Sequence, residues 1–92
     1  MHDIHIIKRR GHKEAYDERK IYASVYSASL NSHLSKADSE KIAGKISEAV
    51  TLWVGYERKE ISSEDIFKKV IELLKAHNND VSFMYATHRD LA

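Results

Sequence analysis

The chain contains no cysteine and no proline, and it has only three glycines among its 92 residues. Without cysteine it can form no disulfide and no thiolate zinc site, and thiol or cysteine-radical chemistry is excluded. Without proline, no helix is interrupted by that residue. No apolar run approaches the roughly 20 residues of a membrane span, and the N-terminus has no apolar signal region. These absences favour a cytoplasmic domain with uninterrupted helices.

Charge of one sign is also lacking. Lysine and arginine number 15 against 14 acidic residues, so the formal net charge is +1 with neutral histidines. A strongly basic nucleic-acid binder would have a much larger excess of cations. The cations of this chain therefore matter through local clustering. The length fits one domain, residues 1–92, with a modest core to which every amphipathic helix should contribute.

Periodicity along the chain indicates a short β segment followed by helices. Gly11 suits the tight turn of a hairpin, Asp17 suits the N-cap of the first helix, and Ser62 or Ser63 suits that of the third. Gly55 is expected to end the second helix. We predict a hairpin at about 4–16, a short third strand at 60–62, and helices at about 18–31, 36–54, 63–76 and 80–90. The expected fold is α+β: a four-helix bundle capped by a small β-hairpin or three-stranded sheet.

Residues 6–21 combine a basic cluster with a strand, a turn and a helix start. Lys8 and Arg9 fall on opposite faces of the strand, and Lys8 shares the face of Ile6, which is expected to turn toward the bundle. A basic pair on a strand is often a solvated edge that discourages aggregation, but a buried lysine needs an anion. Lys20 lies in the first turn of the expected helix, where a cation opposes the dipole. It is either solvated or paired with Asp17, or it faces a docked anion.

This stretch resembles the N-terminal signature of the ATP-cone domain family. The matching positions are Ile6, Lys8-Arg9-Arg10-Gly11, Glu14, Tyr16-Asp17 and Lys20-Ile21. Arg10 stands where the family usually has Asp. The resemblance continues through Ile61, Ser63, Asp65-Ile66 and a closing segment from Val81 to Arg89. It therefore spans nearly the whole chain and implies a small sheet covering a helical bundle.

The resemblance implies a set of phosphate contacts. Lys8, Arg9 and Lys20 would approach the nucleotide phosphates. Ser63 would meet a phosphate from the start of the third helix, although an N-cap role alone would explain it. Arg89 would contact a phosphate or a neighbouring subunit.

The resemblance also implies a base pocket. Glu14 and Asp17 would lie near the adenine and ribose, although local salt bridging and capping would also account for both acids. Ile6 and Ile21 would flank the base, and Phe67 would line the same pocket. Core packing is the alternative role for these three apolar residues.

Catalytic and metal-binding patterns are not found in the sequence. The six histidines are scattered, and none forms an i, i+4 pair with an acid in register, so we expect no metal site. There is no Walker-type glycine-rich loop and no nucleophile–base pattern, so we expect no enzyme activity. A Mg²⁺ ion accompanying a triphosphate would be held mainly by phosphate oxygens.

The sequence therefore predicts a non-catalytic, allosteric regulatory module that binds ATP or dATP. In the family, such domains are usually attached to ribonucleotide reductases or to their transcriptional repressor. This chain would act through nucleotide-dependent self-association or through a partner protein related to ribonucleotide reductase. The alternative is a small protein- or nucleic-acid-interaction domain that uses its basic hairpin. The near-neutral charge and the lack of a basic recognition helix argue against that alternative.

Overall fold

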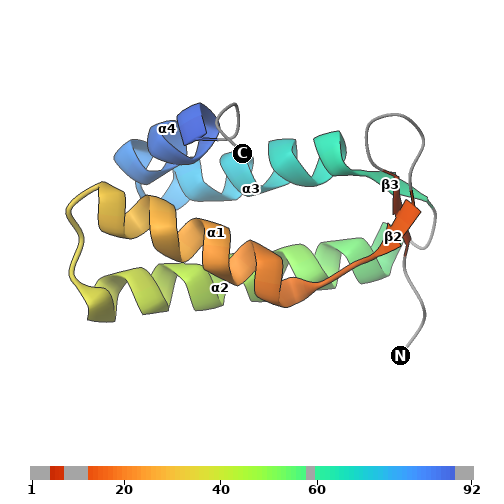
Figure 1. The fold of residues 1–92 in the computed structure, drawn as a ribbon, viewed down its shortest axis with the longest axis horizontal. Coiled ribbons are helices and arrows are strands. Elements are labelled where there is room, and N and C mark those ends of the chain that lie inside the picture. The colour runs from red at the N-terminus through yellow and green to blue at the C-terminus, as the bar shows by residue number, and fades with distance from the viewer. Residues whose placement is uncertain (1–4, 8–12, 58–59, 89–92) are drawn as a thin grey trace.

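Helices dominate the computed structural model, which describes residues 5–7, 13–57 and 60–88. Within these residues the helices are α1 (Glu18–Asn31), α2 (Lys36–Glu57), α3 (Ser63–His77) and α4 (Asn79–His88). The strands are β1 (His5–Ile7), β2 (Lys13–Ala15) and β3 (Ile61–Ser62). Figure 1 shows the strands gathered at one end of the helices.

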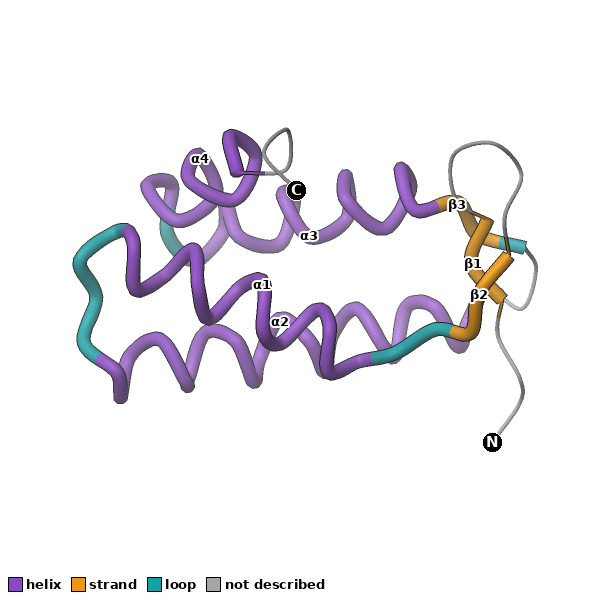
Figure 2. Tube along the Cα trace, in the orientation of Figure 1, coloured by secondary structure: helices purple, strands orange, loops and turns teal. Residues whose placement is uncertain are grey.

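The helices are arranged so that two of them begin at the strand end. α1 follows β2 and α3 follows β3 directly, and both run away from the strands, whereas α2 returns toward them (Figure 1). α1 packs along α2, and α4 packs against both α1 and α3. The loop between α1 and α2 lies at the opposite end of the molecule (Figure 2). The starts of α1 and α3 and the end of α2 therefore all lie toward the strand end.

The strands pair in the order β2-β1-β3. β1 pairs antiparallel with β2, where Ile6 lies opposite Glu14. It pairs parallel with β3, where Ile6 lies beside Ile61. Ile6, the middle residue of β1, therefore links β2, which leads into α1, to β3, which leads into α3.

The predicted α+β fold class is wrong. The helices contain 14, 22, 15 and 10 residues, whereas the strands contain three, three and two. Strands this short pair the segments that lead into the helices, but they do not form the sheet layer of an α+β fold. The physical reason is burial, because the strands supply only Ile6 and Ile61 to the described core and the helices supply all the rest. The described chain is a helical fold.

The helix starts follow from local hydrogen bonding. Asp17 is the N-cap of α1, as predicted. Ser35 accepts a hydrogen bond from the Asp38 amide at the start of α2 (3.1 Å). At the start of α3 the N-cap is Ser62 and not Ser63, and Ser62 forms a reciprocal capping box with Asp65.

The predicted end of α2 at Gly55 is wrong, because the helix continues to Glu57. A glycine inside a helix costs only about 1 kcal/mol relative to alanine. That cost is too small to end a helix whose preceding residues, Val50 and Val54, are fully buried.

α1 ends in a Schellman motif. The His33 amide donates to the Leu30 carbonyl (3.0 Å), and the Leu34 amide donates to the Ser29 carbonyl (3.2 Å). The motif requires a left-handed residue, and His33 takes that conformation with φ of 70°. The turn into α2 is thus built on a histidine where glycine is usual.

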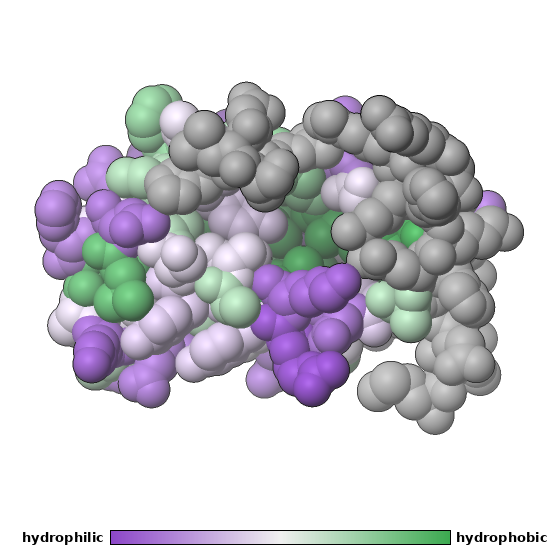
Figure 3. Space-filling model, in the orientation of Figure 1, coloured by the Kyte–Doolittle hydropathy of each residue, from purple (hydrophilic) through white to green (hydrophobic). Residues whose placement is uncertain are grey.

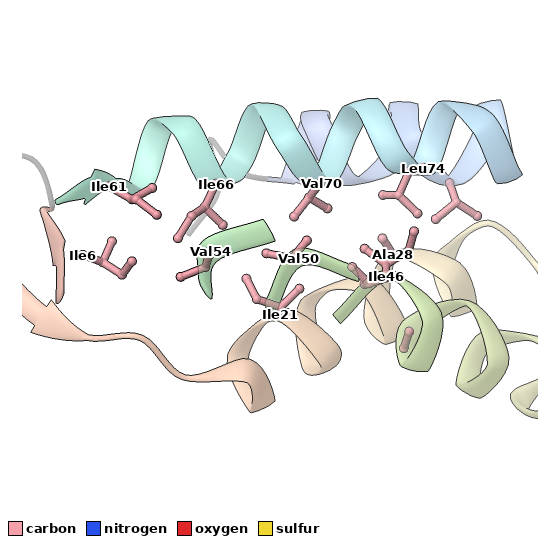
Figure 4. Close-up of a cluster of buried hydrophobic side chains, with 13 residues drawn as sticks. Ile6, Ile21, Ala28, Ile46, Val50, Val54, Ile61, Ile66, Val70 and Leu74 are labelled. Atoms are coloured by element: carbon pink, nitrogen blue, oxygen red, sulfur yellow. The ribbon is translucent and has the colours of Figure 1, made fainter. Parts of the chain in front are cut away.

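The apolar core runs along the length of the bundle (Figure 4). Its buried members are Ile6, Ile21, Val25, Ala28, Ala43, Ile46, Val50, Val54, Ile61, Ile66, Val70, Leu74 and Val81. Every helix and two of the strands contribute at least one residue. The core is therefore continuous from the strand end to the region where α4 packs. Within the described ranges, no helix is both long enough and apolar enough to cross a bilayer.

Candidate functional site

The strand end of the molecule brings together two helix N-termini. α1 begins after Asp17 and α3 begins after Ser62, and the connections to both are joined through β1. The first amides of a helix have no partner within the helix and carry the positive end of its dipole. Two such ends at the same side of a molecule favour an anion.

Asp17 at the start of α1 is already engaged by a neighbour. Its Oδ1 accepts from the Arg19 amide (3.0 Å) and from Arg19 Nε (3.1 Å), and its Oδ2 accepts from the Arg19 guanidinium (3.2 Å). The hydrogen bond from the Arg19 side chain is the main cause of a lowered Asp17 pKa, to which the charge of Lys20 also contributes. Arg19 thus forms an ion pair with Asp17. A ribose or adenine contact by Asp17 would have to replace this guanidinium.

Ser63 at the start of α3 has no capping function. That function belongs to Ser62, whose hydroxyl accepts from the Asp65 amide (3.0 Å), while Asp65 Oδ2 accepts from the Ser62 amide (3.4 Å). Ser63 is the first residue of α3 and is half-buried. The structure thus removes the N-cap explanation for Ser63 and leaves its hydroxyl at the helix N-terminus.

An apolar cluster lies beside these helix starts. The side chains of Ile6, Ile21, Val54, Ile61 and Ile66 point into a common region at the strand end (Figure 4). Ile6, Ile21 and Ile66 keep 5%, 9% and 7% of their surface exposed, whereas Val54 keeps none. The two isoleucines expected to flank a base are therefore in one buried cluster, where they and Ile66 are the least buried members.

Ile66 is a member of this cluster that sequence analysis did not select. Phe67, the next residue, was expected to line the base pocket. Phe67 is half-buried and stacks on Tyr85 of α4, with ring centroids 5.7 Å apart. Successive residues of a helix point about 100° apart, so only one of two adjacent apolar residues can face Ile6 and Ile21. Periodicity places both on one broad stripe and does not separate them.

The surface over this end is polar at the start of α1 and apolar beside it. Glu18, Arg19 and Lys20 in the first turn of α1 are exposed. Figure 3 shows strongly hydrophilic atoms at the start of α1 and hydrophobic atoms in a hollow next to them. Such a surface can hold a ligand that is charged at one end and flat and apolar at the other.

A hydrogen bond ties this end together from the side of α2. The Tyr16 hydroxyl and Thr51 Oγ1 are 2.8 Å apart, although the residues are 35 positions apart in sequence. Burial of the Tyr16 ring is the main cause of its raised pKa. Thr51 was not among the predicted site residues, because nothing local marks it as the partner of an aromatic residue before a helix cap.

Several predicted site residues are not characterised by the structure. Lys8, Arg9 and Arg89 lie outside the described residues, and Glu14 is described only through its backbone in β2. The structure brings Ile6, Asp17, Lys20, Ile21 and Ser63 to the strand end. Among the residues that it describes, no three His, Asp or Glu side chains are grouped so as to hold a metal ion.

Comparison with known protein families matches this chain to a family model. A family model described as the ATP cone domain matches residues 4–90, which is nearly the entire chain of 92 residues. No curated protein matches the chain. The matched range contains all the helices and strands described above, including the whole of the strand end.

Proposed function

The chain belongs to the ATP-cone domain family, whose domains are nucleotide-binding regulatory modules, and we propose that it binds ATP or dATP as an effector and not as a substrate. The observation that carries the proposal is the convergence of two helix N-termini beside the apolar edge formed by Ile6, Ile21 and Ile66. A triphosphate suits the helix starts, and an adenine ring suits the apolar edge.

The proposed phosphate contacts come from three places in the sequence. Lys8 and Arg9 directly follow β1, Lys20 lies in the first turn of α1, and Ser63 opens α3. An anion bound between the two helix starts would make a cation favourable at Lys20, where the α1 dipole alone disfavours it. Arg89 is proposed to contact a phosphate or a neighbouring subunit.

The proposed base contacts surround the apolar edge. Ile6 and Ile21 would pack on the faces of the adenine, with Phe67 further along α3. Glu14 and Asp17 would bind polar groups of the base or ribose, and Asp17 would first exchange its hydrogen bonds with the exposed Arg19 side chain. Exchange of an exposed ion pair is inexpensive, because such pairs contribute about 0–1 kcal/mol.

We further propose that regulation passes through self-association or a partner protein. An effector shifts an equilibrium only when it binds two states unequally. ATP and dATP differ by one hydroxyl, which offers one or two hydrogen bonds of about 1 kcal/mol each. Discrimination between them of roughly five- to thirtyfold is therefore the physical range.

Titration calorimetry of the full chain with ATP, dATP and GTP tests the proposal. We expect both adenine nucleotides to bind more tightly than GTP. We also expect ATP at 100 times its Kd to raise the free energy of unfolding by about 2.7 kcal/mol. The absence of binding and of any thermal shift at millimolar ATP would contradict the proposed function.

Substitution of Lys20 tests the proposed site. Loss of a charge-assisted hydrogen bond should make Lys20→Ala bind ATP about ten- to a hundredfold more weakly with the fold intact. Lys36→Ala is a matched control, because Lys36 is exposed and also lies in the first turn of a helix, at the opposite end of the molecule. Lys8→Ala should weaken binding in the same way as Lys20→Ala. Native affinity in both the Lys8 and Lys20 variants would show that the site is assigned to the wrong residues.

A further inference from the structure

Tyr16 stands in the two-residue connection between β2 and α1, directly before the N-cap Asp17. Its hydroxyl is hydrogen-bonded to Thr51 Oγ1, in the second half of α2, at 2.8 Å. Both side chains are half-buried. The bond therefore attaches the connection to α2, although the connection leads into α1.

The other hydrogen bonds described at this connection are local. The Asp17 side chain accepts from the Arg19 amide, and the Asp17 carbonyl accepts from the Lys20 amide (3.1 Å). These bonds define where α1 begins along the chain. They do not define where that beginning lies relative to α2.

The apolar packing between α1 and α2 specifies this position less sharply than a hydrogen bond does. At the strand end it is made by aliphatic side chains such as Ile21, Val50 and Val54. Apolar burial is non-directional and depends on area, whereas a hydrogen bond weakens steeply when its distance or angle departs from the optimum. A tyrosine has few rotatable bonds, so the Tyr16–Thr51 bond restrains the start of α1 along the axis of α2.

We propose that Tyr16 and Thr51 are positioning residues for the nucleotide site. Their hydrogen bond holds the start of α1 so that Asp17, Lys20 and Ile21 stand at the correct distance from α3 and from the apolar edge at Ile66. Both residues act through α1 and not by touching the nucleotide. This inference rests on the proposed function, because it concerns the affinity of the same site.

Variants that remove only a hydroxyl test the proposal. Tyr16→Phe keeps the ring, Thr51→Val keeps the shape of the threonine, and Thr51→Ser keeps its hydroxyl. Tyr26→Phe is the matched control, because Tyr26 is a half-buried tyrosine of α1 whose ring stacks on Tyr22. ATP affinity is measured by calorimetry for each variant and for the Tyr16→Phe/Thr51→Val double variant. The Tm without nucleotide is measured in parallel.

We expect Tyr16→Phe and Thr51→Val each to weaken ATP binding about three- to tenfold, the range of one hydrogen bond. The double variant should bind no more weakly than the worse single variant, because both substitutions break the same bond. Thr51→Ser and Tyr26→Phe should stay within about twofold of the native protein.

Three results would overturn the inference. They are native affinity in both single variants, a double variant whose loss is the product of the two single losses, and a lower Tm with unchanged affinity. The last result would mean that the bond is merely structural. If the native chain itself fails to bind ATP, the proposed function falls and the inference falls with it. A native chain that binds ATP while the variants are unaffected overturns the inference alone.

Discussion

His33 holds a left-handed backbone conformation at the position where helices most often end with glycine. The side-chain Cβ approaches the following carbonyl in this conformation, at a cost of about 1–2 kcal/mol. Both hydrogen bonds of the Schellman motif are nevertheless made. The turn between α1 and α2 therefore keeps its geometry while it carries strain.

Replacing this histidine with glycine should stabilise the protein. We expect His33→Gly to raise the free energy of unfolding by up to about 1 kcal/mol, because glycine takes positive φ without strain but loses more freedom on folding. Urea denaturation monitored by circular dichroism measures the change.

His77→Gly is the control for this change. His77 is also exposed, but it is the last residue of α3 and does not have a positive φ, so glycine should relieve no strain there and should cost up to about 1 kcal/mol. If both substitutions destabilise the protein by the same amount, the strain at His33 is absent.

Residue chemistry made some contacts of the site predictable and others not. The cap at Asp17 follows from residue type, because it involves amides within three positions of the side chain. The Tyr16–Thr51 bond joins residues 35 positions apart, so no local pattern indicates it. Ile66 and Phe67 could not be told apart for a similar reason, because only the placement of other elements decides which of them faces the core.

At the scale of elements, the adjacent residues Ser62 and Ser63 have different functions at the start of α3. Ser62 is the N-cap and part of the capping box, whereas Ser63 is the first helical residue and does not cap. The amide donors of this helix start are the ones that the proposal assigns to a phosphate.

The two serines should respond differently to substitution. Ser62→Ala should lower the free energy of unfolding by about 1 kcal/mol, the usual effect of losing an N-cap. Ser63→Ala should leave stability within about 0.5 kcal/mol and weaken ATP binding several-fold by loss of one hydrogen bond. Thermal unfolding and calorimetry on the same samples measure both effects. Unchanged ATP affinity in Ser63→Ala would remove Ser63 from the site.

Helices were predictable as elements because their apolar stripes are long and regular. The stripe through Ile42, Ile46, Val50 and Val54 persists through α2. Gly55 does not predict the end of α2, because the weak helix preference of glycine is outweighed by the packing of Val50 and Val54 before it. The predicted α+β class is wrong because the sequence patterns that indicate strands are present, but the strands are too short to form a layer.

At the scale of the whole molecule, the surface has exposed large apolar residues away from the core. Leu52 and Tyr56 on α2 are 61% and 85% exposed, and Phe83 on α4 is 73% exposed. Single exposed apolar residues are common on soluble domains. Leu52 and Tyr56 are one helical turn apart, however, and they lie on the half of α2 that contains Thr51.

Nucleotide-dependent self-association has a measurable outcome. The chain has a mass of 10.6 kDa, so each added copy is resolved by light scattering coupled to size exclusion. We expect the mean mass to change when dATP replaces ATP, because a regulatory effector must bind two states unequally. GTP is the control and should leave the mass as it is without nucleotide. An unchanged mass with both adenine nucleotides, at concentrations well above Kd, would contradict regulation by self-association and leave the partner-protein route.

The parallel pairing of β1 with β3 has a consequence for the order in which the protein takes shape during translation. β1 finds its parallel neighbour only at residues 61–62, so this pairing must wait until those residues have emerged from the ribosome. The α1–α2 hairpin joins elements close in sequence and can form earlier. A nascent chain arrested before residue 61 would thus have the α1–α2 hairpin but neither β3 nor α3, so the nucleotide site proposed above would form late in synthesis.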